Sequence, residues 1–285
     1  MKRTILTLIL GSALATSANA ATIFGVDENN RLVSFDSANP GTFTSDVQIN
    51  GVTGSVLALD VRDSDRTLYA LGGDLRIYTL DAVSGLATAV TGVLALEGTN
   101  FGFDFNTVVD AIRVVSNTDA NYVVGLGGDT PADNTATRFT DVAYGAGDPN
   151  AALDPVVTAN GYIHGTPNQF AIDVANSFLV QQANNAGTLT TVGPLGVAVG
   201  PRTSFDIGFD GTAYLADVNR FYTVDLSTGT ASFVGNTQRA VFGITATPFG
   251  AVPEPSTWAM MLLGFFGIGG AMRRSKVVRT SVSYA

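Results

Sequence analysis

Residues 76–90 read RIYTLDAVSGLATAV, and residues 220–234 read RFYTVDLSTGTASFV. Both begin with an arginine, alternate up to an aspartate, turn at a glycine and enter a second alternating run. Alternation with a period of two is typical of a half-buried β-strand. An aspartate and a glycine around a short turn are typical of a β-hairpin. This stretch therefore predicts a two-stranded unit that the chain uses more than once.

Two further segments follow the same pattern. Residues 31–47 read RLVSFDSANPGTFTSDV, and residues 177–193 read SFLVQQANNAGTLTTVG, which lacks the arginine and the aspartate. We expect a turn to begin at each aspartate and a glycine in each turn to adopt a positive φ. The aspartates are Asp36, Asp81 and Asp225, and the glycines are Gly41, Gly85, Gly187 and Gly229.

The spacing of these segments predicts the number of repeats. Arg76 follows Arg31 by 45 residues, and Arg220 follows Arg76 by 144, or three steps of 48. This spacing predicts five units, of which the third, near residues 100–145, is the most degenerate. Each unit has room for four short strands, such as SVLALDVR, TLYALGG, RIYTLD and LATAVT in the second. Repeated four-stranded units of 40 to 50 residues predict an all-β fold, a five-bladed β-propeller.

The two ends of the repeat region predict how the ring closes. The first unit starts directly at TIFGVD, residues 22–27, without an inner strand, and an unassigned strand VFGITAT remains at residues 241–247. Pairing of these two segments would complete the first blade and leave no open strand edge. An open β-solenoid or a β-sandwich is the alternative arrangement.

The inner strands SVLALDVR, NFGFDFN and SFDIGF align the aspartates Asp60, Asp104 and Asp206. The same alignment places Asn160 and Thr245 in the two remaining units, so we expect a polar ring near the central channel. These side chains would either bond to the backbone of the next blade or hold a cation such as calcium. Two further aspartate clusters, at residues 60–65 and 148–154, also carry oxygen ligands suited to calcium.

Residues with catalytic potential are scarce. His164 is the sole histidine, and residues 21–252 contain no lysine, which excludes amine catalysis there. No hydrolase, metalloprotease or phosphate-loop motif occurs. We therefore expect no catalytic residues, no cofactor beyond a calcium ion, and a non-enzymatic binding or structural role. The alternative is a propeller hydrolase that uses paired carboxylates on an extracellular polysaccharide or a phosphate ester.

The charge of the chain limits its partners. Residues 21–252 contain 9 arginines and 23 acidic residues, a net charge of −14. Such a surface repels polyanions, so nucleic acid is not an expected partner. The chain has no cysteine, and its fold therefore depends on its core rather than on disulfides.

The first 20 residues have the pattern of a secretory signal peptide. Lys2 and Arg3 precede an apolar run at residues 5–14, and Ala-Asn-Ala ends at Ala20. A positive start, a short apolar segment and small residues before the cleavage site are typical of exported proteins. We expect the mature chain to begin at Ala21 and its main domain to span residues 21–250.

The C-terminal segment, residues 251–276, contains VPEPSTWAMMLLGFFGIGGAMRRSK. Its residues 258–272 carry no charge and predict a hydrophobic helix of about 22 Å, which would lie transiently in the inner membrane. Arg273 and Arg274 follow, so this side should remain cytoplasmic, with residues 277–285 as a short cytoplasmic tail.

Two family resemblances follow from these residues. The Pro-Glu-Pro, the hydrophobic segment and the arginines closely resemble the PEP-CTERM sorting signal of Gram-negative bacteria. The resemblance implies recognition by an exosortase, cleavage near Pro253, Glu254 and Pro255, and delivery to the cell surface or extracellular matrix, where polysaccharide is a potential partner. Residues 99–117 and 142–163 resemble a bacterial family of unknown function, which implies no activity.

Overall fold

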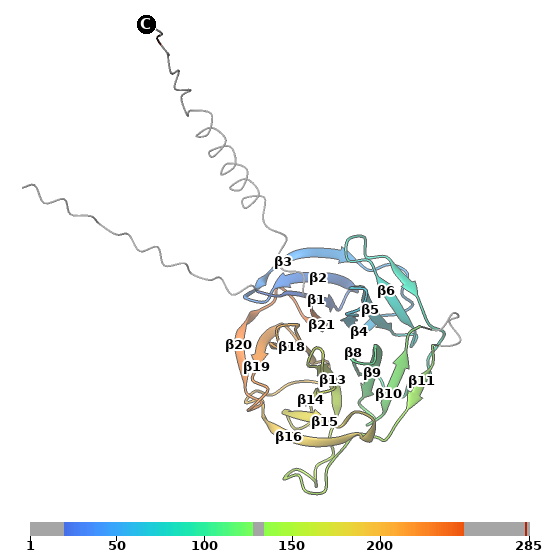
Figure 1. The fold of residues 1–285 in the computed structure, drawn as a ribbon, viewed down its shortest axis with the longest axis vertical. Helices are drawn as coiled ribbons and strands as arrows, with labels where there is room; N and C mark the ends of the chain where they lie inside the picture. Colours follow the sequence, from blue (N-terminus) through green and yellow to red (C-terminus); the bar gives the residue numbers. More distant parts are fainter. Residues whose placement is uncertain (1–19, 128–133, 248–282, 284–285) are drawn as a thin grey trace, which may run out of the picture.

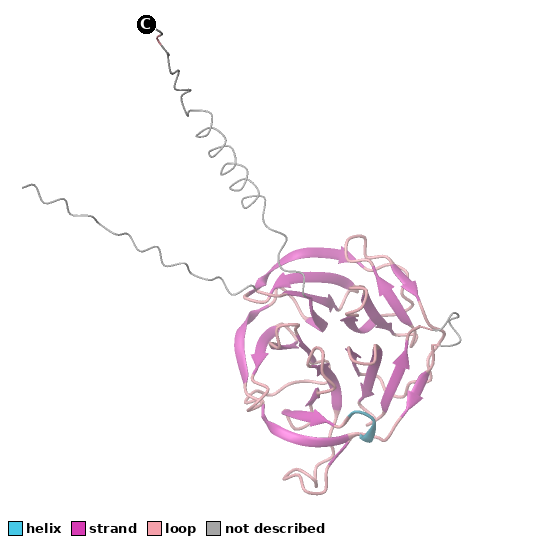
Figure 2. Ribbon diagram, in the orientation of Figure 1, coloured by secondary structure: helices cyan, strands magenta, loops and turns pink. Residues whose placement is uncertain are grey.

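The computed structural model describes residues 20–127, 134–247 and 283. Its strands form five sheets that stand around a common centre (Figure 1). Figure 2 shows strands joined by loops, and the one helical turn among the described residues is a short 3₁₀ helix, η1 (Asn184–Ala186). The prediction of an all-β propeller with five blades is confirmed. The expected hydrophobic helix at residues 258–272 lies outside the described residues.

Blades two to five each follow one rule. Among the four regular strands of each blade, the innermost comes first in the sequence, and each later strand pairs antiparallel with the strand before it. Blade two comprises β4 (Val56–Val61), β5 (Leu68–Gly72), β6 (Ile77–Leu80) and β7 (Ala87–Ala89). Blade three comprises β8 (Phe101–Asn106), β9 (Ala111–Ser116), β10 (Asn121–Gly125) and β11 (Ala136–Arg138).

Blade four has one strand more than the repeat predicts. Its regular strands are β13 (Val157–Tyr162), β14 (Gln169–Asp173), β15 (Phe178–Gln182) and β16 (Thr188–Pro194). The additional strand β12 (Ala143–Tyr144) pairs in parallel with β16 at the outer edge. Blade five comprises β17 (Ser204–Ile207), β18 (Ala213–Asp217), β19 (Arg220–Val224) and β20 (Ala231–Asn236).

Blade one combines both ends of the repeat region. Its order is β21 (Val241–Thr247), β1 (Thr22–Asp27), β2 (Arg31–Asp36) and β3 (Asn39–Gln48). The last strand runs antiparallel to the first, with Thr247 opposite Thr22 and Val241 opposite Asp27. In Figure 1 the two coloured ends of the chain therefore meet in one sheet. The predicted closure of the ring is confirmed.

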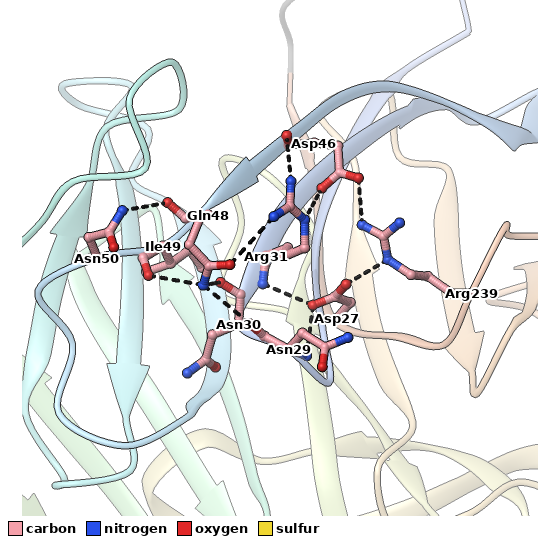
Figure 3. Close-up of polar contacts among 9 residues, drawn as sticks. All are labelled: Asp27, Asn29, Asn30, Arg31, Asp46, Gln48, Ile49, Asn50 and Arg239. Carbon is pink, nitrogen blue, oxygen red and sulfur yellow. Dashed lines mark hydrogen bonds and ion pairs between the residues drawn. The ribbon is translucent and has the colours of Figure 1, made fainter.

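A network of ion pairs and hydrogen bonds stabilises the closure of the ring (Figure 3). Arg239, in the connection from β20 to β21, places its Nε 2.5 Å from Oδ2 of Asp27, whose side chain is fully buried. A second guanidinium nitrogen lies 2.8 Å from Oδ2 of Asp46 on β3, and Arg31 pairs with the other Asp46 oxygen. The backbone N–H groups of Asn29 and Arg31 donate to Oδ1 of Asp27. The connection that leads into the last strand is thus tied to the first blade.

The hydrophobic core is divided among the five blade interfaces. Each interface holds one cluster of buried side chains. Between blades two and three, for example, Leu71 and Ile77 pack with Phe103 and Ile112. Because each blade buries both faces against its neighbours, a single blade could not hide its apolar surface from water.

The predicted hairpin turns are present, with one correction. Oδ1 of Asp81 accepts hydrogen bonds from the backbone N–H groups of Val83 and Ser84, and Gly85 has a φ of 71°. A Cβ on Gly85 would lie 2.1 Å from the carbonyl oxygen of Gln48, so glycine is required there. Gly187 and Gly229 also have positive φ values.

The prediction for Gly41 was wrong. Asp36 pairs directly with Asn39, so the turn is shorter than the repeat suggests, and Gly41 lies within β3. Irregular pairing between β2 and β3 absorbs the extra residues.

Candidate functional site

Three aspartates from three blades meet at the centre of the ring. Asp60 lies on β4, Asp104 on β8 and Asp206 on β17, and one carboxylate oxygen from each lies within 4.8 Å of the other two. All three residues are more than nine-tenths buried. The inner strands of the propeller thus place three acidic groups in one small volume. We call these residues the acidic ring.

A backbone N–H group of an adjoining blade donates to one carboxylate oxygen of each residue in the acidic ring. The contacts are Phe105 N to Asp60 Oδ2 (2.8 Å), Tyr162 N to Asp104 Oδ1 (3.0 Å) and Ala246 N to Asp206 Oδ2 (2.5 Å). The Thr245 hydroxyl from blade one donates to Oδ1 of Asp60 at 2.9 Å. These bonds connect blade one to two, two to three, three to four, and five to one. Each carboxylate therefore has a structural role at a blade interface.

The ring position in blade four is held by glycine, so the prediction for Asn160 was wrong. In blade three, the N–H group that donates to the previous blade belongs to Phe105, the residue after Asp104. In blade four, the corresponding N–H group belongs to Tyr162, the residue after Gly161. Strand pairing agrees, because Gly161 lies opposite Phe170 as Asp60 lies opposite Tyr69. The alignment was displaced by one residue. Thr245, by contrast, is in the ring as expected.

Burial changes the acidity of the ring. Desolvation, followed by repulsion from neighbouring carboxylates, raises the pKa of Asp60 and of Asp104 well above the ordinary value of 3.8. Burial also raises the pKa of Asp206, although the backbone N–H groups of Ala246 and Ile207 oppose this. The cluster can reduce its repulsion by retaining protons or by holding a cation. Cation binding stays a prediction.

A small cavity of about 30 Å³ lies beside the acidic ring and is lined by His164 and Phe209, among others. This volume is close to the share of one water molecule in the liquid, about 30 Å³. The Nε2 atom of His164 lies 3.6 Å from Oδ2 of Asp63. The centre of the His164 ring lies 4.4 Å from the centre of the Phe209 ring. His164 therefore lies near one end of the channel.

The other two aspartate clusters serve the local structure. Asp63 pairs with Arg66, and Asp65 accepts a hydrogen bond from the backbone N–H of Thr67. Asp148 accepts hydrogen bonds from both the backbone N–H and the hydroxyl group of Thr191. The side chains of Asp63, Asp65 and Asp148 thus stabilise turns and strand contacts.

A larger pocket, of about 290 Å³, is lined by the inner strands on the other side of the acidic ring. Its lining residues come from all five blades. Leu57, Phe101 and Phe205 are among its apolar lining side chains. The channel therefore has two different ends, one acidic and narrow, the other wider and lined by both apolar and polar side chains. We call the wider one the channel pocket.

Three polar side chains of the channel pocket have no hydrogen-bond partner within the described residues. They are the hydroxyl groups of Thr158 and Ser204 and both amide atoms of Asn160. Their residues are 3%, 7% and 1% exposed. A buried polar group without a partner costs about 1–3 kcal/mol, so each of the three would be stabilised by a hydrogen bond to a water or to a bound molecule.

Asn160 stands where the other blades have hydrophobic residues. With Gly161 in the ring, the residue before it corresponds to Leu59, Phe103, Phe205 and Ile244. Room for the amide is provided by Gly102, because a Cβ there would lie 2.3 Å from Oδ1 of Asn160. Sequence reasoning missed this pocket because the displaced alignment assigned Asn160 to the ring. The correct register would have shown one amide among four hydrophobic residues.

Of the residues predicted to direct export, the structure describes two. Ala20 and Ala21 precede β1, and the N–H of Ala21 donates to the Ser37 hydroxyl at 3.0 Å. Pro253, Glu254, Pro255, Arg273 and Arg274 lie outside the described residues.

Comparison with known protein families identifies the family of the repeat region. Residues 31–245 match the family described as a domain of unknown function, DUF4394. The chain belongs to this family. The DUF4394 region coincides with the propeller, so the resemblance seen at residues 99–117 and 142–163 is confirmed. No curated protein matches the chain.

Comparison with solved structures gives a distant match. A chain from the crystal structure of a nidogen/laminin complex is 10% identical, covers 79% of the present chain and 98% of its own length, and has a TM-score of 0.49. A likeness this distant carries no information about ligands.

The C-terminal resemblance is also confirmed. Residues 251–274 match the PEP-CTERM protein-sorting motif. This motif is the recognition signal for an exosortase, so the protein is exported in a Gram-negative bacterium and is anchored in the membrane before cleavage. Over residues 20–127 and 134–247, the structure contains no helix with the length and apolar character that a membrane span requires.

Proposed function

We propose that this exported propeller is a non-catalytic binding protein, displayed at the cell surface or in the extracellular matrix, that captures a small polar molecule in the channel pocket. The observation that carries the proposal is the group of unpartnered polar atoms on Thr158, Asn160 and Ser204. A pocket that combines apolar side chains with a few convergent polar groups is typical of small-molecule sites. The sorting motif supports a location where external molecules are accessible.

The chemistry of the acidic ring supports binding rather than hydrolysis. Glycosidases place two carboxylates about 5–10 Å apart, with the substrate between them. The carboxylates of Asp60, Asp104 and Asp206 are instead more than nine-tenths buried beside a cavity of only about 30 Å³, and they accept backbone hydrogen bonds. Their role in joining blades explains their positions without a reaction.

Thermal melts of the purified protein with a panel of sugars, hydroxy acids and amides would test the proposal. A molecule that fills the pocket should raise the melting temperature in proportion to its concentration. Asn160→Leu keeps the branched shape but removes the amide, so it should abolish this rise. It should also raise the melting temperature without ligand, because the unpartnered group is gone.

Two further variants sharpen the comparison. Thr158→Val removes one pocket hydroxyl and should weaken the response. Thr190→Val makes the same change on the exposed outer strand β16 and should leave it unchanged. Equal responses from the wild type and Asn160→Leu would refute binding in the channel pocket.

A further inference from the structure

One arginine of the propeller has no anionic partner in the described part of the chain. Of the nine arginines in residues 21–252, seven form ion pairs with carboxylates: Arg31, Arg62, Arg66, Arg76, Arg138, Arg220 and Arg239. Arg113 is bonded to neutral side chains of Tyr162, Asn121 and Asn185. Arg202 is the exception, although acidic residues outnumber arginines by more than two to one.

Arg202 lines the channel pocket and is held in a defined position. Its guanidinium carbon lies 3.8 Å from the centre of the Phe242 ring, which is itself part of the pocket lining. Stacking on an aromatic face leaves the edges of the planar guanidinium available for hydrogen bonds. Those edges suit the two oxygens of a carboxylate, which can accept two parallel bonds. An exposed, stacked and unpaired guanidinium in a pocket therefore points to a carboxylate ligand.

The electrostatics of the channel set the orientation of such a ligand. Asn160, near the bottom of the pocket, directly precedes the ring position Gly161 and so lies next to the acidic ring, whose carboxyl groups offer no positive charge to a negative ligand group. The polar atoms without partners on Asn160, Thr158 and Ser204 are neutral amide and hydroxyl groups. Neutral hydroxyl groups of a ligand should face them, while its carboxylate should remain at Arg202.

The size of the pocket and the charge of the protein limit the class of ligand further. About 290 Å³ is near the lower limit of small-molecule sites, roughly 300 Å³. With one guanidinium and a net charge of −14 on residues 21–252, a doubly charged group such as a phosphate is disfavoured.

We propose that the channel pocket binds a hexuronate-sized hydroxy acid, with the carboxylate on Arg202 and the hydroxyl groups toward Asn160, Thr158 and Ser204. The inference rests on the proposed function, because it names the class of molecule that this pocket takes. A free sugar acid and the terminal unit of an acidic polysaccharide present the same chemistry.

Isothermal titration calorimetry on the purified protein would test the inference with glucuronate, glucose, glucose 6-sulfate and an oligogalacturonate. Glucuronate should bind at least tenfold more tightly than glucose. Arg202→Gln should remove this difference while keeping the binding of glucose. Arg76→Gln, which changes an exposed arginine paired with Asp74 outside the pocket, should preserve the difference. The net charge of −14 on residues 21–252 should weaken binding of the oligogalacturonate relative to glucuronate. Binding of the monomer alone would therefore support a free acid, and binding of the oligomer at least as tightly would support a polysaccharide end whose contacts outweigh this repulsion.

Other outcomes would contradict the inference in distinguishable ways. Equal affinity for glucose and glucuronate, a preference for the sulfate, or an unchanged preference in Arg202→Gln would overturn the carboxylate assignment. Binding of a neutral molecule that is lost in Asn160→Leu would nevertheless leave the proposed function standing. No heat with any of the four ligands would overturn the inference, and an unresponsive panel in thermal melts would overturn the proposed function as well.

Discussion

Replacement of Arg239 by alanine should destabilise the closed ring. Its partner Asp27 has a fully buried side chain, and loss of one member of a buried ion pair costs about 3–5 kcal/mol. Arg239 itself is 32% exposed, so water can partly replace it and the cost should be lower. Loss of the exposed pair with Asp46 adds at most about 1 kcal/mol. Loss of the contact with the Phe43 ring, at 5.0 Å, adds a similar amount.

We therefore expect Arg239→Ala to lower the free energy of unfolding by about 2–4 kcal/mol. For a domain of this size each kcal/mol lowers the melting temperature by about 2–4 °C, so a loss of 3 kcal/mol corresponds to about 6–12 °C. Circular dichroism melts and urea titrations would measure both quantities. A parallel decrease in the urea midpoint with an unchanged slope would show that stability, rather than compactness, has changed.

Arg31→Ala is the matched control. Arg31 pairs with the same Asp46, but both side chains of that pair are about one-third exposed. This variant should lose no more than about 1 kcal/mol. Equal losses in the two variants, or a decrease below about 4 °C for Arg239→Ala, would refute the reasoning that Arg239 neutralises a buried carboxylate.

Three further predictions concern the ring and the chain ends. Because Asp60 and Asp104 have a pKa raised well above 3.8, these two groups bind more protons in the native protein than in the unfolded chain above about pH 4. The melting temperature should therefore fall as the pH rises from about 4 through the raised pKa values. Asp104→Asn should flatten this fall, and a steeper fall in the variant would contradict the argument. If the ring holds a cation instead, calcium should remove the fall in the wild type and a chelator should restore it. Deletion of Val241–Thr247 removes the inner strand of blade one, so the remaining protein should be insoluble or lack a cooperative melt. An unchanged melt would argue against ring closure as a source of stability. Mass spectrometry of the protein from its native host should find ends near Ala21 and Val252. An intact C-terminus in the mature fraction would exclude cleavage during sorting.

Local sequence patterns predicted the fold well. The alternation in the strands, the aspartate–glycine turns at Gly85 and Gly229 and the isolated segment at residues 241–247 all correspond to observed elements. Each of these signals depends on neighbouring residues or on the repeat period. The short strand Ala143–Tyr144 was not predicted, because a two-residue pairing produces no periodic pattern.

The candidate site was less predictable because it depends on register between blades. A displacement of one residue moves a side chain to the other face of its strand. Gly161 offers no side chain with which to recognise the ring position, and Asn160 beside it resembles the aspartates chemically. Arg202 is likewise one exposed arginine among several in the sequence. Its lack of a partner becomes visible only when the pairs of the other arginines are known.

The first blade also has a consequence for the order of events during synthesis. Thr22 and Thr247 are neighbours in the sheet, and the Thr247 hydroxyl donates to the Thr22 carbonyl across 225 residues of chain. Contacts of such long range form slowly, because the chain must first lose the entropy of closing the intervening loop. Blade one, which begins to emerge first, therefore cannot be completed until nearly the whole domain has been made. The nascent chain stays open throughout that period and can be passed through a narrow export channel before it closes.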